Sequence, residues 1–330
     1  MNSFGRILRV HIFGESHGEC VGVTVDGCPA GLALGADDFT TDIERRKGGN
    51  KGTTPRKEDD IPQIKTGLFN GKTTGAPITI LFDNANTRSA DYEKQRAIPR
   101  PGHADFVAHK KFGGNEDYRG SGHFSGRLTV CLVAAGVIAK KILGQVNIIS
   151  TILEIGGETD LDKGLQKAID AKDSIGGIIE CRTSGLPVGL GEPFFDSAES
   201  LLSHAVFAIP AVRGIEFGTG FAAAKMFGSK HNDAILDEAG TTGTNHAGGI
   251  VGGLTNGNEL VFRIAIKPTS STPIEQQSLN WETHAVENFS VKGRHDLCIA
   301  LRVPVILEAV TAIVLADLML LDQRINRVIV

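Results

Sequence analysis

Two short glycine-containing segments each place a histidine beside groups that could bind an anion or move a proton. The first, Gly14–Gly18 (GESHG), follows an apolar stretch and sets His17 next to a glycine. The second, Arg100–Asp105 (RPGHAD), contains a rigid Pro-Gly turn from which an arginine could present its paired N–H groups to a carboxylate or phosphate. Histidine donates a proton near neutral pH, and glycine allows close approach of the backbone to a ligand. Taken alone, a histidine in a turn such as the first segment is more often structural, and the second segment is equally compatible with a turn of solvent-exposed charges.

A third segment, Gly120–Arg127 (GSGHFSGR), leads into a predicted helix. Ser125 is a suitable N-cap, apolar positions recur at helical spacing, and Gly144 follows Leu143 as a stop signal, so the pattern predicts a helix over Ser125–Leu143. Free N–H groups and the positive end of the helix dipole make such a start an anion site. The alternative is a plain capped helix start.

Three further segments are rich in cations and hydroxyl groups. Glu44–Lys57 (ERRKGGNKGTTPRK) has no apolar period and is predicted to be a loop. Lys267–Ser271 (KPTSS) offers a cation and hydroxyl groups after a predicted strand, and Lys292–Asp296 (KGRHD) is a charged cluster before the last apolar stretch. Solvated loops remain the alternative for all three, since runs of charge usually face water.

Two other patterns are poor candidates for sites. Gly218–Ala223 (GTGFAA) matches a dinucleotide-binding pattern and would suit a nicotinamide-dependent dehydrogenase. The residues before it include Pro210, Arg213 and Glu216, whereas a first Rossmann strand is buried on both faces and almost entirely apolar. The histidine of Asn245–Gly249 has no metal-ligating partner at a recognisable spacing, so we expect no metal site.

The composition excludes several classes of protein. A net charge of −4 over 330 residues gives no global basic field for nucleic acid or an anionic membrane, so an anionic ligand requires a local basic cavity. Five cysteines without a CxxC pair favour a reducing compartment, and the N-terminal residues lack a signal-peptide pattern. Ile299–Leu321 is interrupted by charges and is predicted to be a buried helix rather than a membrane span.

Strands and helices are both predicted along the whole chain. A helix should begin near Pro304, because proline suits the first helical position. No linker rich in proline or serine divides the sequence, so we expect a single α+β domain over residues 1–330. The predicted strands are Val21–Val25, Pro77–Phe82, Gly176–Cys181 and Leu260–Ile266.

The order of these motifs resembles the chorismate synthase family from end to end. The series GESHG, RRKGGNKGTTPR, GKTTGAPI, RPGHAD, DYRGSGHFSGR, GLGEP, NHAGGI, KPTSS and KGRHD covers essentially the whole chain. The resemblance implies the fold of that family, a β-α-β layered sandwich with a large antiparallel sheet component, assembled as a homotetramer.

The resemblance also implies an activity. Family members are cytoplasmic carbon–oxygen lyases of the shikimate pathway, which leads to the aromatic amino acids. They convert 5-enolpyruvylshikimate-3-phosphate to chorismate and phosphate by anti-1,4 elimination, and they require reduced FMN without net redox change. Some members reduce their own flavin with NADPH. Nothing in this chain resembles an added reductase domain, so we expect an external supply of reduced flavin. A module that binds flavin or phosphate without turnover is the non-enzymatic alternative.

Residue roles carry over by position. His17 is implied as the acid for the leaving phosphate, His103 as the acid for the reduced flavin, and Asp296 as the carboxylate that helps to remove the ring proton. The implied substrate contacts are Ser16, Arg46, Lys51, Arg100, Arg127 and Arg294. The implied flavin contacts are His123, Phe124, Ser125, Pro210, Ala211, Gly252, Lys267, Pro268, Thr269, Ser270, Ser271 and Arg294.

Several positions depart from the family pattern. Many members have Arg-Ser-Ser where this chain has His123-Phe124-Ser125, so the first two flavin contacts must be made by backbone or differ in kind. Pro210 replaces a usual asparagine and cannot donate an N–H. Lys51 stands near a usual arginine with one residue deleted, and the chain is shorter than many members between Glu154 and Gly177.

Overall fold

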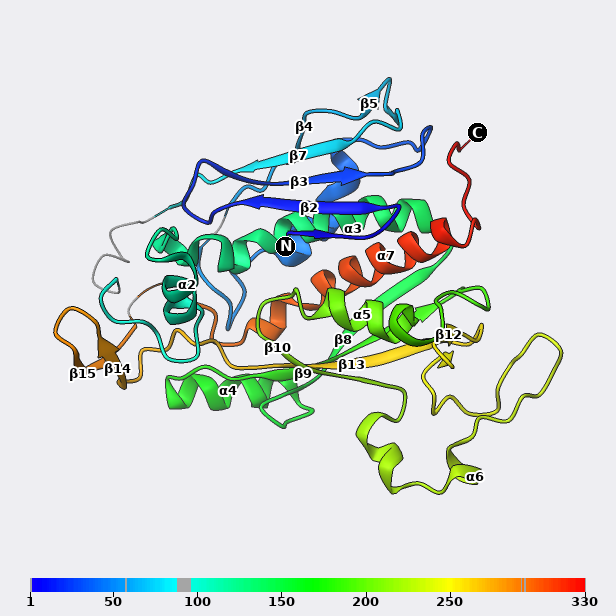
Figure 1. Ribbon diagram of the computed structural model, residues 1–330. Helices are drawn as coiled ribbons and strands as arrows, with labels where there is room; N and C mark the ends of the chain where they lie inside the picture. Colours follow the sequence, from blue (N-terminus) through cyan, green and yellow to red (C-terminus); the bar gives the residue numbers. More distant parts are fainter. Residues whose placement is uncertain (1, 57, 88–95, 292, 294, 330) are drawn as a thin grey trace.

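Two antiparallel sheets enclose a layer of helices in the computed structural model, which describes residues 2–56, 58–87, 96–291, 293 and 295–329 (Figure 1). The first sheet has the strand order β1-β2-β3-β7-β4 and the second β10-β13-β9-β8. The strands of the first sheet are β1 Ser3–Phe4, β2 Arg9–Gly14, β3 Cys20–Asp26, β7 Ile78–Asp83 and β4 Gln63–Ile64. Those of the second are β10 Val212–Phe217, β13 Leu260–Ile266, β9 Gly177–Ser184 and β8 Asn147–Ile155.

Alternating burial explains why the long strands form where they do. In β3, Val21, Val23 and Val25 are fully buried on one face, as the two-residue period of a strand requires. β13 pairs with β9 in continuous antiparallel register, from Leu260 opposite Thr183 to Ile266 opposite Gly177. The four predicted strands are thus confirmed, and β13 has the predicted bounds.

The helices between the sheets bury their side chains against both of them. α3 contacts β3 and β2 of the first sheet, whereas α7 contacts β8 and β9 of the second. Their mutual approach is close: a Cβ placed on Gly136 of α3 would lie 2.2 Å from Cβ of Ala309 in α7, so only glycine fits there. α4 covers the outer face of the second sheet at β8 (Figure 1). The helices are α1 Thr40–Arg46, α2 Asp105–Phe112, α3 Thr129–Leu143, α4 Leu161–Ala171, α5 Ala198–Val206, α6 Gly228–His231 and α7 Pro304–Leu321. The predicted β-α-β sandwich is confirmed.

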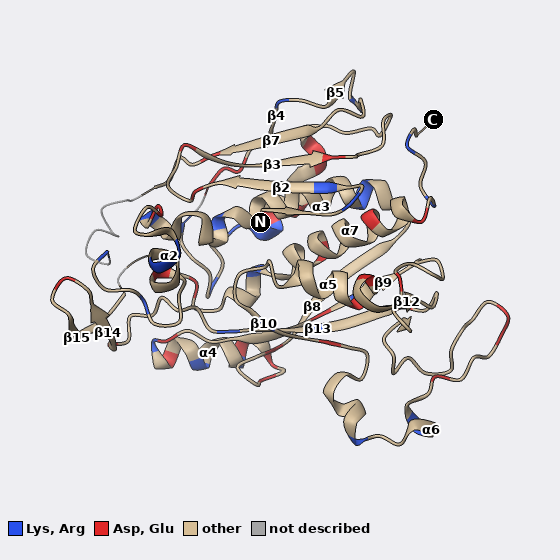
Figure 2. Ribbon diagram, in the orientation of Figure 1, with Lys and Arg blue, Asp and Glu red and all other residues tan. Residues whose placement is uncertain are grey.

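α7 begins at Pro304 as predicted and carries only two charged side chains, which appear as red positions on its tan ribbon in Figure 2. Glu308 accepts two hydrogen bonds from Arg45, both of 2.7 Å. Asp317 accepts the backbone N–H groups of Arg6, Ile7 and Leu8, each at 2.8 Å. Among the described residues, α7 is the one helix long and apolar enough to cross a membrane, but 83% of it is buried inside the protein, as predicted for a core helix.

Two predicted boundaries were wrong. Helix α3 begins at Thr129 rather than Ser125, because Gly126–Leu128 form a separate 3₁₀ turn. The Ser125 hydroxyl caps that turn by accepting the N–H of Arg127 at 3.3 Å. The basic stretch is also not entirely a loop, since its first three residues form the last turn of α1.

Besides the two large sheets, the described chain contains short hairpins. The segment that matches the dinucleotide-binding pattern follows β10 of the second sheet. Gly218–Ala223 follows β10, which runs antiparallel to β13, and leads into the 3₁₀ helix Gly220–Lys225 rather than an α-helix. No βαβ unit surrounds this segment. The hairpins are β5 Leu68–Phe69 with β6 Lys72–Thr73, β11 Ile250–Val251 with β12 Leu254–Thr255, and β14 Gln276–Asn280 with β15 Ala285–Phe289.

Candidate active site

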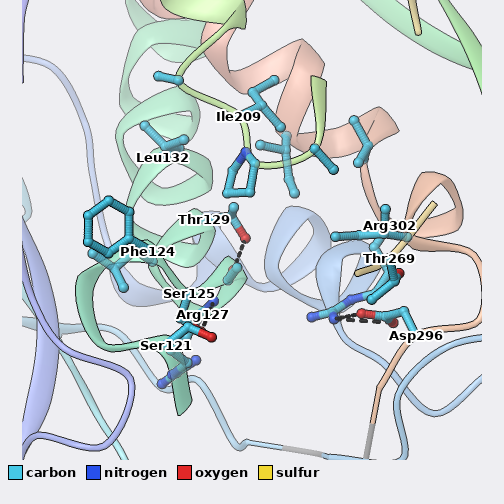
Figure 3. Close-up of a pocket in the computed structure, with 18 of the residues that line it drawn as sticks. Ser121, Phe124, Ser125, Arg127, Thr129, Leu132, Ile209, Thr269, Asp296 and Arg302 are labelled. Atoms are coloured by element: carbon cyan, nitrogen blue, oxygen red, sulfur yellow. Dashed lines mark hydrogen bonds and ion pairs between the residues drawn. The ribbon is translucent and has the colours of Figure 1, made fainter. Parts of the chain in front are cut away.

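A cavity of about 840 Å³ opens where the first sheet, the helical layer and several loops meet. One part of its wall is apolar, as Leu132 and Ile209 illustrate in Figure 3, and another part is polar, with Asp296 and Arg302 on the side opposite Ser121 and Phe124. Helix α7 and the turn before it contribute further apolar wall residues, namely Val303, Ile306, Val310 and Ile313.

Cations dominate the polar part of the described wall. Eight basic side chains line the cavity against three carboxylates, although the whole chain has a net charge of −4. A chain with this net charge needs such a local basic cavity to bind an anionic ligand. The basic residues are Arg46, Lys47, Arg56, Arg100, Arg127, Arg213, Lys267 and Arg302, and the carboxylates are Glu58, Asp60 and Asp296.

Arg46 and Arg127 meet at one buried carboxylate. Asp60 accepts a 2.5 Å hydrogen bond from Arg46 Nη2 on one oxygen and a short hydrogen bond from Arg127 Nη1 on the other. Burial lowers the pKa of Arg46 to about 10, against the opposing effect of Asp60, so this guanidinium still carries its charge at neutral pH. Burial alone would raise the pKa of Asp60, but the two arginines hold it below its ordinary value.

Arg100 organises a second polar cluster, around His103. Its Nε and Nη2 donate to the two oxygens of Asp105 at 2.7 and 2.8 Å, and its Nη1 donates to Ser271 Oγ at 3.0 Å. Nδ1 of His103 lies 2.6 Å from Asp105 Oδ1, and Nε2 lies 3.2 Å from Ser121 Oγ. A tautomer protonated on Nδ1 therefore donates to Asp105 and leaves Nε2 beside the Ser121 hydroxyl.

Burial shifts the pKa of His103 below its ordinary value of 6.5. The hydrogen bond to Asp105 opposes this shift, and the charges of Arg100 and Lys267 reinforce it. In the absence of a ligand, His103 is therefore held in its neutral form.

We expect the imidazole of His103 to titrate below pH 6.5 in the ligand-free protein, measured by NMR. Asp105→Asn should move the midpoint lower, because the hydrogen bond and charge of Asp105 raise the pKa of His103. Since the unfolded chain binds this proton more readily, the contribution of His103 to stability should be lost as the pH falls below 6.5. A midpoint above 6.5, or an upward shift in the variant, would contradict this account of the site.

Ser16 and His17 lie behind the cavity wall rather than in it. Both are buried, and a Cβ on Gly120 would lie 2.5 Å from Cδ2 of His17 and 3.0 Å from Oγ of Ser16, so glycine permits this contact. Gly120 itself lines the cavity. Ser16 Oγ also accepts a 3.1 Å hydrogen bond from Arg56, a lining residue. One backbone glycine thus separates His17 from the space where a ligand would lie.

Asp296 faces the cavity from the segment before α7. One of its oxygens accepts the backbone N–H of Thr54 at 2.8 Å, and the other accepts Arg302 Nη1 at 3.1 Å. Arg302, which lies beside Asp296 in Figure 3, also donates from Nε to the carbonyl oxygen of Arg46 at 2.9 Å, so it links Asp296 to the end of α1.

The structure gathers most of the predicted flavin contacts at the same cavity. Lys267 Nζ lies 2.5 Å from Ser270 Oγ and 3.1 Å from the carbonyl oxygen of Gly102, which ties this segment to the RPGHAD turn. Thr269 Oγ1 is buried and has no hydrogen-bond partner among the described residues. The other predicted contacts that line the cavity are His123, Phe124, Ser125, Pro210, Ala211, Pro268 and Ser271.

Besides Ser16, three predicted contacts are not placed in the cavity wall. Lys51 is exposed and its ammonium group lies 3.4 Å from Gln166 of α4. Gly252 lies in the turn between β11 and β12 and is not part of the cavity wall. Arg294 lies outside the described residues.

Sequence reasoning missed several charged residues of the wall. Arg56 is the last arginine of the basic motif RRKGGNKGTTPR, but the sequence predicted no role for it. Lys47, Arg213 and Arg302, together with the carboxylates Glu58 and Asp60, carried no local signal that distinguishes a cavity residue from a solvated charge.

Fold and cavity together define a layered α+β protein with a largely cationic cavity that suits an anionic ligand. The chorismate synthase family model matches residues 8–320. A chorismate synthase of Chitinophaga pinensis is 70% identical over 329 residues, 99% of each chain, and one of Dehalococcoides mccartyi is 45% identical over 361 residues, again 99% of each chain.

A solved crystal structure of chorismate synthase aligns with a TM-score of 0.74 at 25% identity, covering 97% of this chain and 93% of that one. The chain therefore belongs to the chorismate synthase family, an enzyme family of the lyase class.

Proposed function

We propose that this chain eliminates phosphate from 5-enolpyruvylshikimate-3-phosphate by anti-1,4 elimination to give chorismate, and that the reaction requires reduced FMN without net redox change. The observation that carries the proposal is the cationic cavity with its apolar wall. The substrate bears two carboxylates and a phosphate, about four negative charges at neutral pH. Eight cations against three carboxylates suit such a ligand, and the shikimate pathway supplies it.

The residues present also fit a flavin phosphate. The apolar wall at Ile209 and Ile306 suits a planar ring system, whereas Lys267 and Ser270 offer a cation and a hydroxyl for a phosphate. The buried Thr269 hydroxyl, which lacks a partner among the described residues, is a further polar group that a ligand would satisfy. When bound, the reduced flavin supplies electron density that assists loss of phosphate and is recovered as hydrogen departs.

The remaining chemistry belongs to side chains of this chain. By resemblance we assign His17, which lies behind Gly120 in this structure, as the proton donor to the departing phosphate. His103 is assigned as the proton donor to the reduced flavin, and Asp296 as the carboxylate that helps to remove the ring proton. Because burial holds His103 neutral without a ligand, its donor role requires bound anions, whose charge raises the pKa of a neighbouring imidazole. Arg46, Arg100 and Arg127, which line the cavity, are the proposed substrate contacts, with Ser16, Lys51 and Arg294 as further candidates by resemblance.

An anaerobic assay with chemically reduced FMN tests the proposal directly. We expect release of phosphate and formation of chorismate with reduced FMN, and no turnover with strictly oxidised FMN or without flavin. The physical reason is that only the reduced flavin can supply the electron density that assists loss of phosphate. Anaerobic turnover with strictly oxidised FMN would refute the mechanism, and an absence of turnover with reduced FMN would refute the function.

We also propose a cytoplasmic homotetramer supplied with reduced flavin from outside. Large apolar side chains on the second sheet's connections support an interface between copies, because exposed apolar clusters mark contact surfaces. Phe195 is 93% exposed. The other exposed apolar side chains on these connections include Phe194, Phe221, Phe227 and Ile235.

A further inference from the structure

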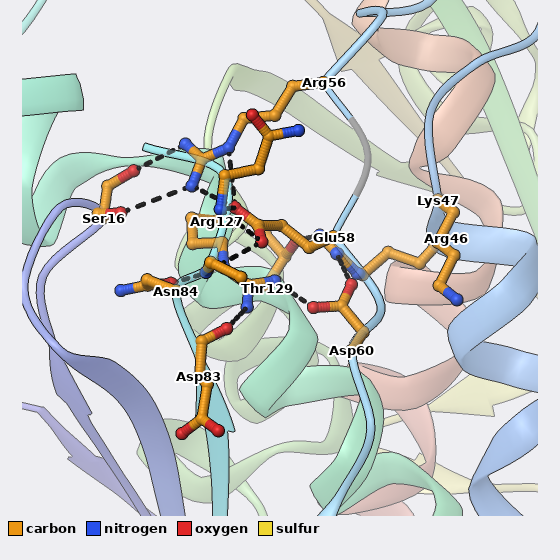
Figure 4. Close-up of polar contacts among 12 residues, drawn as sticks. Ser16, Arg46, Lys47, Arg56, Glu58, Asp60, Asp83, Asn84, Arg127 and Thr129 are labelled. Carbon is orange, nitrogen blue, oxygen red and sulfur yellow. Dashed lines mark hydrogen bonds and ion pairs between the residues drawn. The ribbon is translucent and has the colours of Figure 1, made fainter. Parts of the chain in front are cut away.

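Asp60 is the one carboxylate that joins two arginines of the described cavity wall. Its side chain is fully buried, and each of its oxygens accepts a different guanidinium, Arg46 on one and Arg127 on the other (Figure 4). The two arginines come from separate elements, since Arg46 ends α1 and Arg127 lies in the 3₁₀ turn before α3. Without a shared counterion, two buried guanidinium groups would repel each other.

The two guanidinium groups keep N–H donors to spare. Arg127 donates to Asp60, to Asn84 Oδ1 at 2.9 Å and to the carbonyl oxygen of Asp83 at 3.1 Å. Arginine has five N–H donors, so two are left over after these three bonds to described residues. Arg46 donates to Asp60 and to Thr129 Oγ1 at 3.3 Å, and its Nε has no partner among the described residues. Among the described residues, both arginines therefore keep N–H groups without a partner, and both side chains line the cavity.

The backbone around Asp60 shows that its position is imposed by the surroundings. Its φ is +51°, a left-handed conformation that a non-glycine residue adopts at an energetic cost. Two residues earlier on the same face of the chain, Glu58 accepts Arg56 Nη2 at 2.7 Å and the backbone N–H of Asn86 at 3.1 Å. The carboxylates of Glu58 and Asp60 therefore hold this three-residue segment against the cavity wall.

We propose that Asp60 is a positioning residue for the anionic substrate: it fixes Arg46 and Arg127 side by side so that their spare N–H groups bind one acidic group of the ligand. This inference rests on the proposed function, because it assumes that the substrate occupies this cavity. Asp60 acts through the arginines and does not itself touch the reacting atoms.

Asp60→Asn tests the proposal, with Asp59→Asn as the matched control. Asp59 is the exposed neighbour, so its replacement makes the same change in net charge without altering the arginines. An asparagine at position 60 keeps one oxygen acceptor but turns an NH₂ group toward the other arginine, which can only donate. Calorimetric titration without flavin, using 5-enolpyruvylshikimate-3-phosphate and then inorganic phosphate, measures affinity apart from turnover.

We expect Asp60→Asn to weaken substrate binding by about 10- to 100-fold, in line with loss of a buried charge-assisted hydrogen bond. KM should rise more than kcat falls, and Asp59→Asn should match the wild type. If Asp60 merely neutralises charge, its loss leaves the cavity more positive, and anions should bind more tightly. Tighter or unchanged binding in Asp60→Asn would therefore overturn the proposal.

Asp60→Glu covers the case in which Asp60→Asn does not fold. Glutamate keeps the charge and both acceptors but moves the carboxylate by one methylene, so a positioning role predicts weaker substrate binding in a folded protein. Wild-type affinity in Asp60→Glu would also overturn the proposal. A wild-type chain that does not turn over the substrate refutes the proposed function instead, so the two failures are distinguishable.

Discussion

Replacing Asp296 by asparagine is expected to lower turnover by about 100-fold or more, the effect typical of a positioned acid–base group, while both ligands still bind. Asparagine nearly matches aspartate in size, and its oxygen can still accept the 2.8 Å hydrogen bond from the N–H of Thr54. It cannot accept a proton at neutral pH. Anaerobic single-turnover kinetics with reduced FMN, together with separate titrations of flavin and substrate, measure this effect.

The alternative role for Asp296 is purely structural, since Arg302 pairs with it at 3.1 Å and connects it to the end of α1. That role predicts a lower melting temperature and weaker flavin binding along with the loss of activity. Asp322→Asn is a suitable control, because Asp322 forms an exposed ion pair with Arg324. Wild-type turnover in Asp296→Asn would eliminate the assignment as a base.

Arg100→Ala is expected to weaken substrate binding by about 2–4 kcal/mol, roughly 30- to 1,000-fold, and to weaken flavin binding less. The substitution removes a buried cation that faces the cavity and holds Asp105 and Ser271 in place. Separate titrations of the two ligands measure the difference. Arg100 is a better test than Arg46, whose loss would also leave Asp60 with a single partner.

Some loss of stability should accompany Arg100→Ala, because Asp105 loses the arginine that holds its pKa well below the usual range against the effect of burial. Arg119→Ala is the control: Arg119 also pairs with an aspartate, Asp117, but its side chain is 41% exposed. Surface pairs of this kind contribute little to stability. Unchanged substrate affinity in folded Arg100→Ala would remove this residue from the binding site.

The fold could be anticipated from sequence where burial has a simple period. Alternating valines at 21, 23 and 25 marked β3, and the apolar run after Pro304 marked α7. The start of α3 was misplaced because Ser125 is a good cap for either kind of helix, and sequence does not distinguish a 3₁₀ turn from the first turn of an α-helix. The layering followed from family resemblance, since local pattern does not determine which sheet a helix covers.

The site was predicted only in part, for a comparable reason. In a motif such as RPGHAD, the interacting residues are close in sequence, so their proximity could be predicted. The structure places Arg100 and His103 of this motif in the cavity wall. Asp60 and Arg302 were missed because their partners are distant in sequence: Asp60 meets Arg127 across 67 residues, and Arg302 meets Arg46 across 256. A charge whose counterion is contributed by another part of the chain looks the same in sequence as one that faces water.

The contact between Asp317 and the backbone of Arg6, Ile7 and Leu8 spans about 310 positions of the chain. During synthesis, Arg6–Leu8 leave the ribosome long before Asp317. The segment between β1 and β2 can therefore form these hydrogen bonds only after α7 has been synthesised. Until then the apolar faces of β3 and α3 lack part of their cover. Contacts of such large sequence separation slow folding and prolong exposure to aggregation, so we infer that the chain folds after synthesis rather than segment by segment during it.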